Sequence, residues 1–310
     1  MTGQPCRHGW EALSGDPLPT LLGEGAGLRW RALVDLVKRP GDSPAVSRAR
    51  SMANAEQPVS TLLEELLPSG EWSGAGLHPW QHPGGFGWRL VAASQLGADP
   101  SDPRLQAAWS RLLRLETGDG GFAPAGEKPS PVVTARAVAA LTPLGYLAEP
   151  RAVEAAAWLE EVAWDGNAGS PAVTAAAVLA AGPELTAARR GLVERAVETL
   201  LDELGAASAS LSLEGLSWPN LLRTDVAEVL GSLARASVKY DGRMRKGLVE
   251  LQARQGEGGL WTADEVEALP RGVERREMGF WVTLSAVCAL LSYAVEAGLP
   301  RVYPQPPAKG

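Results

Sequence analysis

The chain has 310 residues, a formal net charge of −7 at pH 7 and a pI near 5.2. An acidic chain lacks the basic face that nucleic-acid binding requires, so we expect no nucleic-acid partner. No apolar run is long enough to span a bilayer and no signal-peptide pattern is present, so we expect no integral membrane segment and a cytoplasmic location. Arginine outnumbers lysine and alanine is abundant, a composition that favours a bacterial source with a GC-rich genome.

Taken in chain order, the residues predict a flexible N-terminus at 1–18, one helical domain at 19–298 and a flexible, proline-rich tail at 299–310. Glycine and proline are spread along the chain as turn residues, which favours one domain over two. The loop 74–87, GAGLHPWQHPGGFG, has a composition that suits a lid. The hydrophobic periodicity predicts helices at 28–38, 43–53, 58–67, 88–96, 103–115, 131–144, 151–162, 171–181, 185–204, 223–236, 241–254 and 275–297.

A glycine-rich turn with an aromatic residue ends several of these helices, most clearly TGDGGF at 117–122. Turns of this kind fall near residues 72, 122, 167 and 261, and we expect a degenerate copy at 211–218. The helices that follow two of the turns open almost identically, with SPVVTA at 130–135 and SPAVTA at 170–175. A spacing of roughly 40–50 residues, with one helix pair in each unit, is typical of a helical repeat array.

One helix of each pair is apolar on almost every face, whereas its partner is amphipathic. A helix that is apolar nearly all round is a buried one. We therefore predict an all-α fold with an inner ring of apolar helices and an outer ring of amphipathic helices. Together with the N-terminal helices this gives about five to six pairs, enough to close a barrel around a central apolar cavity. The inner helices would begin at Trp88, Pro131, Pro171, Arg223 and Phe280.

The segment LQARQGEGGLW at 251–261 is similar to the Q-x-x-G-x-W turn that precedes the inner helices of squalene–hopene cyclases and terpene cyclases. The segments WPNLLRTDV at 218–226 and WVTL at 281–284 resemble those of short, single-domain squalene-cyclase-like proteins of bacteria. The resemblance extends over roughly residues 28–297. It implies an α/α toroid, a double ring of helix hairpins that is shared with the β subunits of protein prenyltransferases.

The chain departs from the catalytic motifs of that superfamily. Class II terpene cyclases use an Asp of a D-x-D-D-T-A motif as the acid, whereas 130–135 and 170–175 keep the Thr-Ala pair without any Asp. The sequence also has no D-D-x-x-D cluster that would hold magnesium and a diphosphate. Cys288 is the one cysteine expected in the inner ring and no histidine follows it, so we expect no zinc site, no other metal and no cofactor. Cys288 is explained more simply as a small buried residue.

Four side chains are candidates for the catalytic acid or base. Asp225 lies beside Arg223 at an inner-helix N-terminus, where burial would raise its pKa and the helix dipole and Arg223 would lower it. Its alternative role is to cap the helix, which we weigh slightly above catalysis. Glu277 is either an acid or base at the cavity mouth or half of a surface ion pair. His78 and His82 are either proton shuttles or plain exposed histidines of the loop.

Tryptophan is abundant, with 11 residues against 3 phenylalanines. Packing explains those in the repeated turns, whereas Trp88, Trp218 and Trp281 are predicted to line the cavity, where their π faces stabilise positive charge. The predicted substrate contacts are Trp80, Phe86, Trp88, Thr134, Trp218, Arg223, Phe280 and Trp281. Thr134 has an alternative role, because a threonine recurs at the same repeat position, as at Thr283, which favours a structural hydrogen bond.

These observations favour an enzyme, a metal-independent cyclase or isomerase of a lipophilic small molecule such as a terpenoid, a polyene or another natural-product intermediate. Folding the substrate in a Trp-lined cavity would contribute most of the catalysis, with one acid or base assisting. The alternative from a different class is a non-catalytic protein that binds hydrophobic ligands or acts as a scaffold. Prenyl transfer is a weaker third hypothesis. The sequence indicates neither the substrate nor the oligomeric state.

Overall fold

The computed structural model describes residues 9–66, 85–123, 128–142, 149–162, 171–181, 185, 189–206, 215–220, 223–264 and 274–302. These residues form helices and no β-strand, which confirms the all-α prediction for the described part of the chain. The first helices are η1 (Trp10–Ala12), α1 (Leu18–Gly23), α2 (Ala26–Asp35), α3 (Pro44–Ala53), α4 (Val59–Glu65), α5 (Phe86–Gln95), α6 (Pro103–Leu112) and η2 (Leu113–Leu115). The later helices are α7 (Pro131–Leu141), α8 (Pro150–Val162), α9 (Pro171–Ala180), α11 (Arg190–Ala206), α12 (Val226–Arg235), η5 (Gly242–Met244), α13 (Arg245–Ala253), η6 (Glu257–Gly259) and α14 (Arg275–Tyr293).

The helices differ in how much of their surface is buried. In α9 every residue from Ala172 to Leu179 is buried, so that helix has no face left for water. In α11 the buried residues recur at helical spacing, as at Leu192, Ala196 and Leu200, and the remaining face is polar. This contrast between apolar and amphipathic helices is what the sequence pattern predicted.

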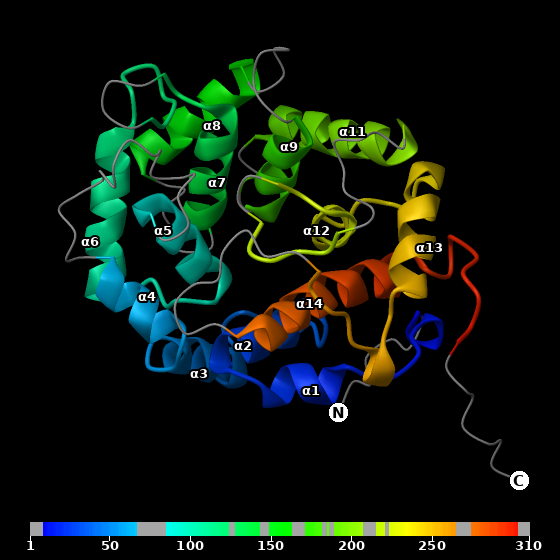
Figure 1. Ribbon diagram of the computed structural model, residues 1–310. Coiled ribbons are helices and arrows are strands. Elements are labelled where there is room, and N and C mark those ends of the chain that lie inside the picture. The colour runs from blue at the N-terminus through cyan, green and yellow to red at the C-terminus, as the bar shows by residue number, and fades with distance from the viewer. Residues whose placement is uncertain are drawn as a thin grey trace, which may run out of the picture.

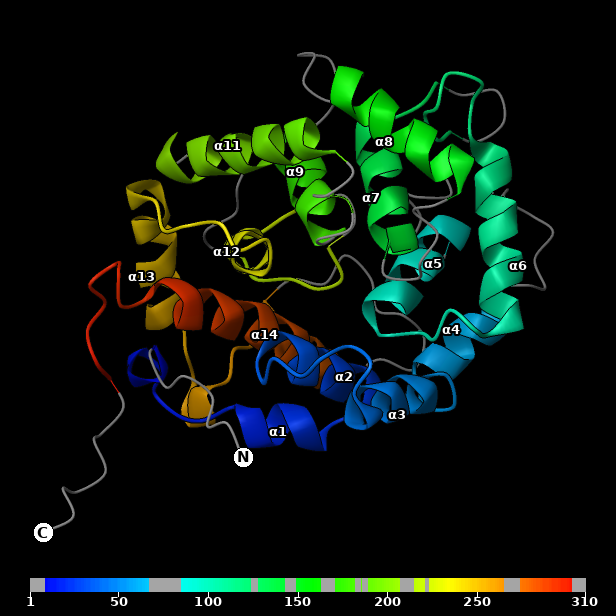
Figure 2. The same ribbon diagram turned by 180° about the vertical axis from the view of Figure 1, so that it is seen from behind.

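The apolar helices contact one another in succession. Helix α5 packs against α7, α7 against α9, α9 against α12, α12 against α14, and α14 against α2. Helices α6, α8, α11 and α13 lie outside this succession in Figures 1 and 2. Each of them packs against a neighbouring apolar helix: α6 on α5, α8 on α7, α11 on α9, and α13 on α12 and α14.

Threonine side chains join the repeated turns to the helices that follow them. The backbone N–H of Phe122 donates to Thr134 Oγ1 (2.9 Å), and the N–H of Trp261 donates to Thr283 Oγ1 (2.9 Å). Both threonines are fully buried. A buried N–H without an acceptor costs about 1–3 kcal/mol, so each of these bonds fixes a turn aromatic in place. The structural role weighed for the recurring threonine is therefore confirmed at Thr134 and Thr283.

The two ends of the described chain make hydrogen bonds to other parts of the fold. Leu13 is fully buried, and the N–H of Ser14 donates to Gln255 Oε1 (2.6 Å). The N–H of Val302 donates to the carbonyl oxygen of Glu11 (2.8 Å). A buried leucine and these hydrogen bonds connect residues 9–18 to the end of α13 and to the last described residues of the chain.

Candidate functional site

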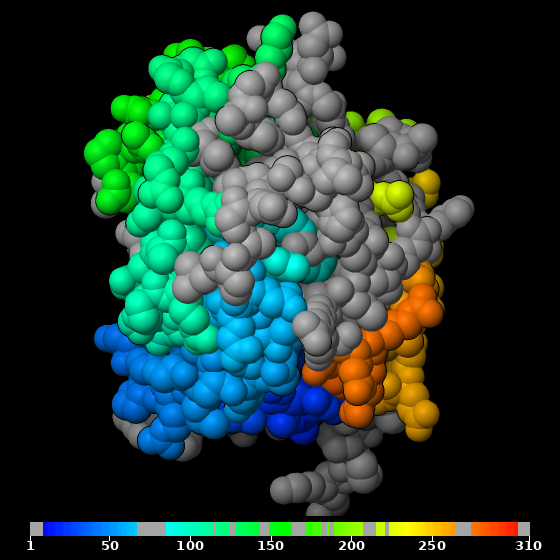
Figure 3. Space-filling view, turned by 60° about the vertical axis from the view of Figure 1, so that its left-hand side comes forward, coloured from blue at the N-terminus to red at the C-terminus, as the bar shows by residue number. Residues whose placement is uncertain are grey.

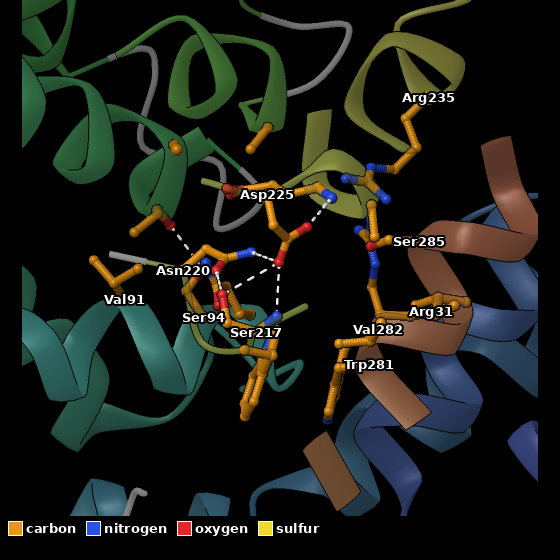
Figure 4. Close-up of a pocket in the computed structure, with 18 of the residues that line it drawn as sticks. Arg31, Val91, Ser94, Ser217, Asn220, Asp225, Arg235, Trp281, Val282 and Ser285 are labelled. Carbon is orange, nitrogen blue, oxygen red and sulfur yellow. Dashed lines mark hydrogen bonds between the residues drawn. The ribbon is translucent and has the colours of Figure 1, made fainter. Parts of the chain in front are cut away.

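A cavity of about 110 Å³, here called the main cavity, lies between α2, α5, α7, α12 and α14 and the segment 215–220 (Figure 4). Its walls combine apolar residues of the buried helices with aromatic and charged side chains. The charged side chains in its walls are Arg31, Arg136, Asp225, Glu228 and Arg235. The cavity is therefore more polar than the apolar cavity that the sequence predicted.

Asp225 caps α12 from within the wall of the main cavity. The side chain is only 1% exposed, and Oδ1 accepts a hydrogen bond from the N–H of Glu228 (2.8 Å). Oδ2 accepts bonds from the N–H of Ser217 (2.8 Å), the hydroxyl of Ser217 (3.2 Å) and Nδ2 of Asn220 (3.4 Å). The capping role weighed for Asp225 is confirmed, and the same carboxyl group faces the cavity (Figure 4).

Burial raises the pKa of Asp225 to about 6, because the ionised carboxylate has lost its water. The hydrogen bonds from Glu228 N–H, Ser217 and Asn220 act against this, and the negative charge of Glu228 adds to it. A carboxyl group with such a pKa exchanges its proton close to neutral pH. This is the range in which an acid or base is useful in catalysis.

A buried ion pair stands next to Asp225. Nη1 of Arg136 donates to Oε1 of Glu228 (2.7 Å), and the side chains are 2% and 10% exposed. The hydroxyl of Thr224 donates to Oε2 of Glu228 (2.7 Å), and Nη2 of Arg136 donates to the carbonyl oxygen of Arg223 (3.1 Å). The sequence analysis missed this pair. The signal was present, because Arg136 is the one charged residue in α7 and Glu228 is the one acidic residue in α12.

Two of the three tryptophans predicted to line a cavity do so in the structure. The rings of Trp218 and Trp281 stack with their centroids 5.2 Å apart and an angle of 13° between their planes, and both line the main cavity. Trp88 is buried and is not among the residues that line it. Its Nε1 has no acceptor among the described residues, and Trp30 of α2 lines the cavity instead.

The remaining predicted contacts lie away from the main cavity within the described residues. Arg223 is exposed and contributes its carbonyl oxygen to Arg136, as above. Phe86 is buried at the start of α5, where the Arg111 guanidinium lies 5.0 Å from its ring centroid. The hydroxyl oxygen of Thr134 accepts the hydrogen bond from the N–H of Phe122.

Glu277 and Phe280 line a second, smaller cavity of about 40 Å³, which Trp281 separates from the main one. Glu277 forms a capping box with Glu274 at the start of α14, a role that neither sequence hypothesis named. Burial raises the pKa of Glu277 above its usual range. Figure 3 shows the start of α14 (orange) at the molecular surface, on the face that also carries α4 and α6.

The predicted loop candidates His78, His82 and Trp80 lie outside the described residues. Among the residues that are described, no group of three or more His, Cys, Asp or Glu side chains is placed to hold a metal ion. Cys288 is buried, and burial raises the pKa of its thiol to about 12.

Neither the known protein-family models nor the curated proteins contain a match to this chain. None of the described helices combines the length and the apolar character that a membrane crossing requires.

Proposed function

We propose that the helices of this chain form an α/α toroid of the squalene-cyclase-like type, with the main cavity near its centre. The unbroken succession of α5, α7, α9, α12, α14 and α2 supports this arrangement, as do the amphipathic helices that pack outside it. The main cavity lies between members of the inner succession and is lined by α12 from its N-cap, Asp225, to its last residue, Arg235.

We further propose that the protein is an isomerase or cyclase that transfers a proton within a small, lipophilic molecule. The observation that carries this proposal is the buried carboxyl group of Asp225, which faces the main cavity beside the stacked rings of Trp218 and Trp281. Asp225 would donate its proton to one atom of the substrate, and the resulting carboxylate would take a proton from another. The substrate then changes its structure without a change in mass. The two indole faces would stabilise the positive charge that protonation creates.

The volume of the main cavity limits the substrate. A buried cavity of about 150 Å³ holds a benzene ring, and the main cavity measures about 110 Å³. A substrate that fits without rearrangement is therefore smaller than a terpenoid. A terpenoid would require the walls of the cavity to move apart.

The second candidate function is ligand binding without chemistry. It is favoured by the four hydrogen bonds that the Asp225 carboxyl group already accepts, because a proton-transfer group must exchange at least one of them for the substrate. Prenyl transfer is a weaker third proposal, which predicts that turnover requires a diphosphate donor and a divalent metal.

The test compares the wild-type protein with Asp225→Asn in an extract of cells that lack the gene, with all small molecules followed by mass spectrometry. We expect the wild type to convert one species into another of equal mass and different retention time. We expect Asp225→Asn to lose this conversion. Asp102→Asn is the matched control, because Asp102 caps α6 in the same way and is not among the residues that line the main cavity. Conversion by Asp225→Asn at the wild-type rate would remove Asp225 from the mechanism. A compound that copurifies with both proteins and is converted by neither would favour binding.

A further inference from the structure

The side of the main cavity that faces Asp225 is basic. Figure 4 shows Arg31 of α2, Arg235 of α12 and Ser285 of α14 together, across the cavity from Asp225 and Asn220. Burial and the charge of Asp35 raise the pKa of the buried Cys288 thiol on α14, and the charges of Arg235, Lys38 and Arg31 lower it.

The cations of the cavity differ in how well they are neutralised. Arg136 is paired with Glu228, and Nη2 of Arg31 lies 2.7 Å from Oδ2 of Asp35. Nη2 of Arg235 donates to the hydroxyl of Ser232 (3.0 Å), and no described carboxylate is paired with it. Arg235 is half-buried, so its charge is only partly solvated. A guanidinium group in such a place attracts anions, because the low local dielectric strengthens the interaction.

We propose that the main cavity binds an organic anion whose carboxylate or phosphate group lies at Arg235, with Arg31 beside it, and whose apolar body lies against Trp218 and Trp281. The inference rests on the proposed function, since it assigns the substrate class of the same cavity. A guanidinium group binds a carboxylate or a phosphate through two parallel hydrogen bonds, which fixes the orientation of the ligand. The anionic end is then held away from Asp225, and the opposite end of the ligand lies toward the Asp225 carboxyl group.

The alternative role of Arg235 is purely structural: its charge would stabilise the C-terminal end of α12, as cations at helix ends do. That role requires the charge alone and no ligand. The two readings differ in what they predict for a neutral molecule of the same shape, and for a lysine at position 235.

The test uses three small probes of similar size: butyrate, butyl phosphate and 1-butanol. Each is titrated into the ¹⁵N-labelled full chain at low salt, and the indole N–H signals of the tryptophans are followed by NMR. We expect at least one of the two anions to bind at least tenfold more tightly than 1-butanol, and the better anion identifies the head group. Arg235→Gln is expected to weaken binding of that anion at least tenfold and to leave 1-butanol unaffected. Arg48→Gln, an exposed arginine of α3, is the matched control and is expected to change neither.

Equal affinity for 1-butanol and both anions would overturn the inference, and so would unchanged anion binding by Arg235→Gln. If Arg235→Gln does not fold, Arg31→Gln and Arg235→Lys provide the same comparison. Weakened anion binding is expected for both, because lysine keeps the charge and loses the two parallel hydrogen bonds, whereas the charge-only role predicts a stable, unchanged Arg235→Lys protein. The proposed function fails separately: anion binding without conversion of any molecule would remove the isomerase and keep the anion site. If Arg235→Gln converted a neutral substrate as fast as the wild type does, the anion site would be removed and the isomerase kept.

Discussion

The carboxyl group of Asp225 has two tasks whose electrostatic requirements conflict. As the cap of α12 it accepts hydrogen bonds from backbone N–H groups, which favour the ionised form. As a buried group beside the negative charge of Glu228 it is favoured in the protonated form. Burial is the larger effect, so the folded protein binds the Asp225 proton more tightly than the unfolded chain does.

This difference predicts how Asp225 changes stability with pH. The pKa of Asp225 is 3.8 in the reference state and about 6 in the fold, so the folded state carries more protons between these values. The contribution of Asp225 to the free energy of unfolding is therefore greatest below pH 3.8 and falls as the pH rises to about 6, by at most about 3 kcal/mol. Urea denaturation gives the free energy of unfolding of the wild type and of Asp225→Asn at pH 4 and pH 7. The difference between the two proteins, wild type minus variant, should fall from pH 4 to pH 7.

The control for that experiment is Asp102→Asn, because the pKa of Asp102 is shifted in the opposite direction from that of Asp225. A side-chain hydrogen bond from Arg104 lowers the pKa of Asp102, so the contribution of Asp102 is lost as the pH falls through its folded pKa. Between pH 4 and pH 7 the difference between the wild type and Asp102→Asn should therefore change little, because that loss occurs below the reference pKa of 3.8. If the Asp225 pair gave the same slope as the Asp102 pair, the buried carboxyl group would be ionised throughout and unsuited to proton transfer.

The buried pair of Arg136 and Glu228 gives a second prediction at the scale of single residues. Removing one partner leaves a charge in the protein interior without its counter-ion, which is costlier than losing an exposed pair. We expect Glu228→Gln to lower the free energy of unfolding by about 3 kcal/mol, measured by urea denaturation at pH 7. The pKa of Asp225 should also fall, because the Glu228 charge raises it.

Glu198→Gln is the matched control, because Glu198 pairs with Arg243 at the surface, where water and salt screen the charges. We expect it to leave the free energy of unfolding nearly unchanged. Equal effects of Glu198→Gln and Glu228→Gln would show that the interior pair is hydrated and does not shape the main cavity.

Sequence reasoning reached part of the site and missed the rest for identifiable reasons. Asp225 is the N-cap of α12, Trp218 lies in the segment before that helix, and Trp281 lies in the second turn of α14. The sequence placed all three near predicted helix starts, where side chains can be assigned to a mouth or a cavity from the order of elements alone. The rotation of each helix about its axis decides whether a residue further along it faces the cavity, and sequence order does not contain that angle. Arg136 was therefore missed, although a lone charge in a buried helix must have a partner.

At the scale of elements, the start of α2 and the end of α5 cross with almost no space between them. A Cβ atom built on Gly27 would lie 1.8 Å from the carbonyl oxygen of Leu96, so the contact requires glycine. A backbone atom cannot move aside as a flexible side chain can. We expect Gly27→Ala to force α2 away from α5 and to lower the melting temperature strongly, although alanine favours helix formation by about 1 kcal/mol.

Gly23 at the end of α1 provides the control, since a Cβ atom there meets nothing within 4 Å. Gly23→Ala should leave the melting temperature unchanged or raise it slightly. Thermal unfolding followed by circular dichroism compares the two. A loss in Gly27→Ala no larger than that in Gly23→Ala would mean that the two helices are not in direct backbone contact.

The helices themselves were largely predictable, and the exceptions have a physical cause. The predicted ranges 131–144 and 171–181 correspond to α7 and α9, because proline at the first helical position and a long apolar run mark the same residues in both. Helix α1 (Leu18–Gly23) was not predicted. It has six residues, too few to show a periodic pattern, and it is held by packing on α2 rather than by its own sequence.

At the scale of the whole molecule, the beginning and the end of the described chain are joined. Nε2 of Gln252 donates to the carbonyl oxygens of Ala12 and Pro300, at 2.9 and 2.8 Å, so one side chain bridges the two ends. Glu11 and Arg301 form an ion pair beside it. If the chain is one domain from 19 to 298, as predicted, this junction stabilises the whole molecule and not merely its ends.

Leu13 is the residue that tests this last point. It is fully buried at the junction, and replacing a fully buried leucine by alanine costs about 2–5 kcal/mol. In a single cooperative domain that loss lowers the protection of the slowest-exchanging amides everywhere, including those of α7 on the other side of the molecule. In a chain of independent units it affects only the helices that contact the junction. Hydrogen exchange of Leu13→Ala therefore separates the two cases.

The control is Val302→Ala, since Val302 is 47% exposed at the same junction and its truncation should change no protection factor measurably. Faster exchange in α13 and α14 of Leu13→Ala with unchanged exchange in α7 would show that the chain unfolds in parts.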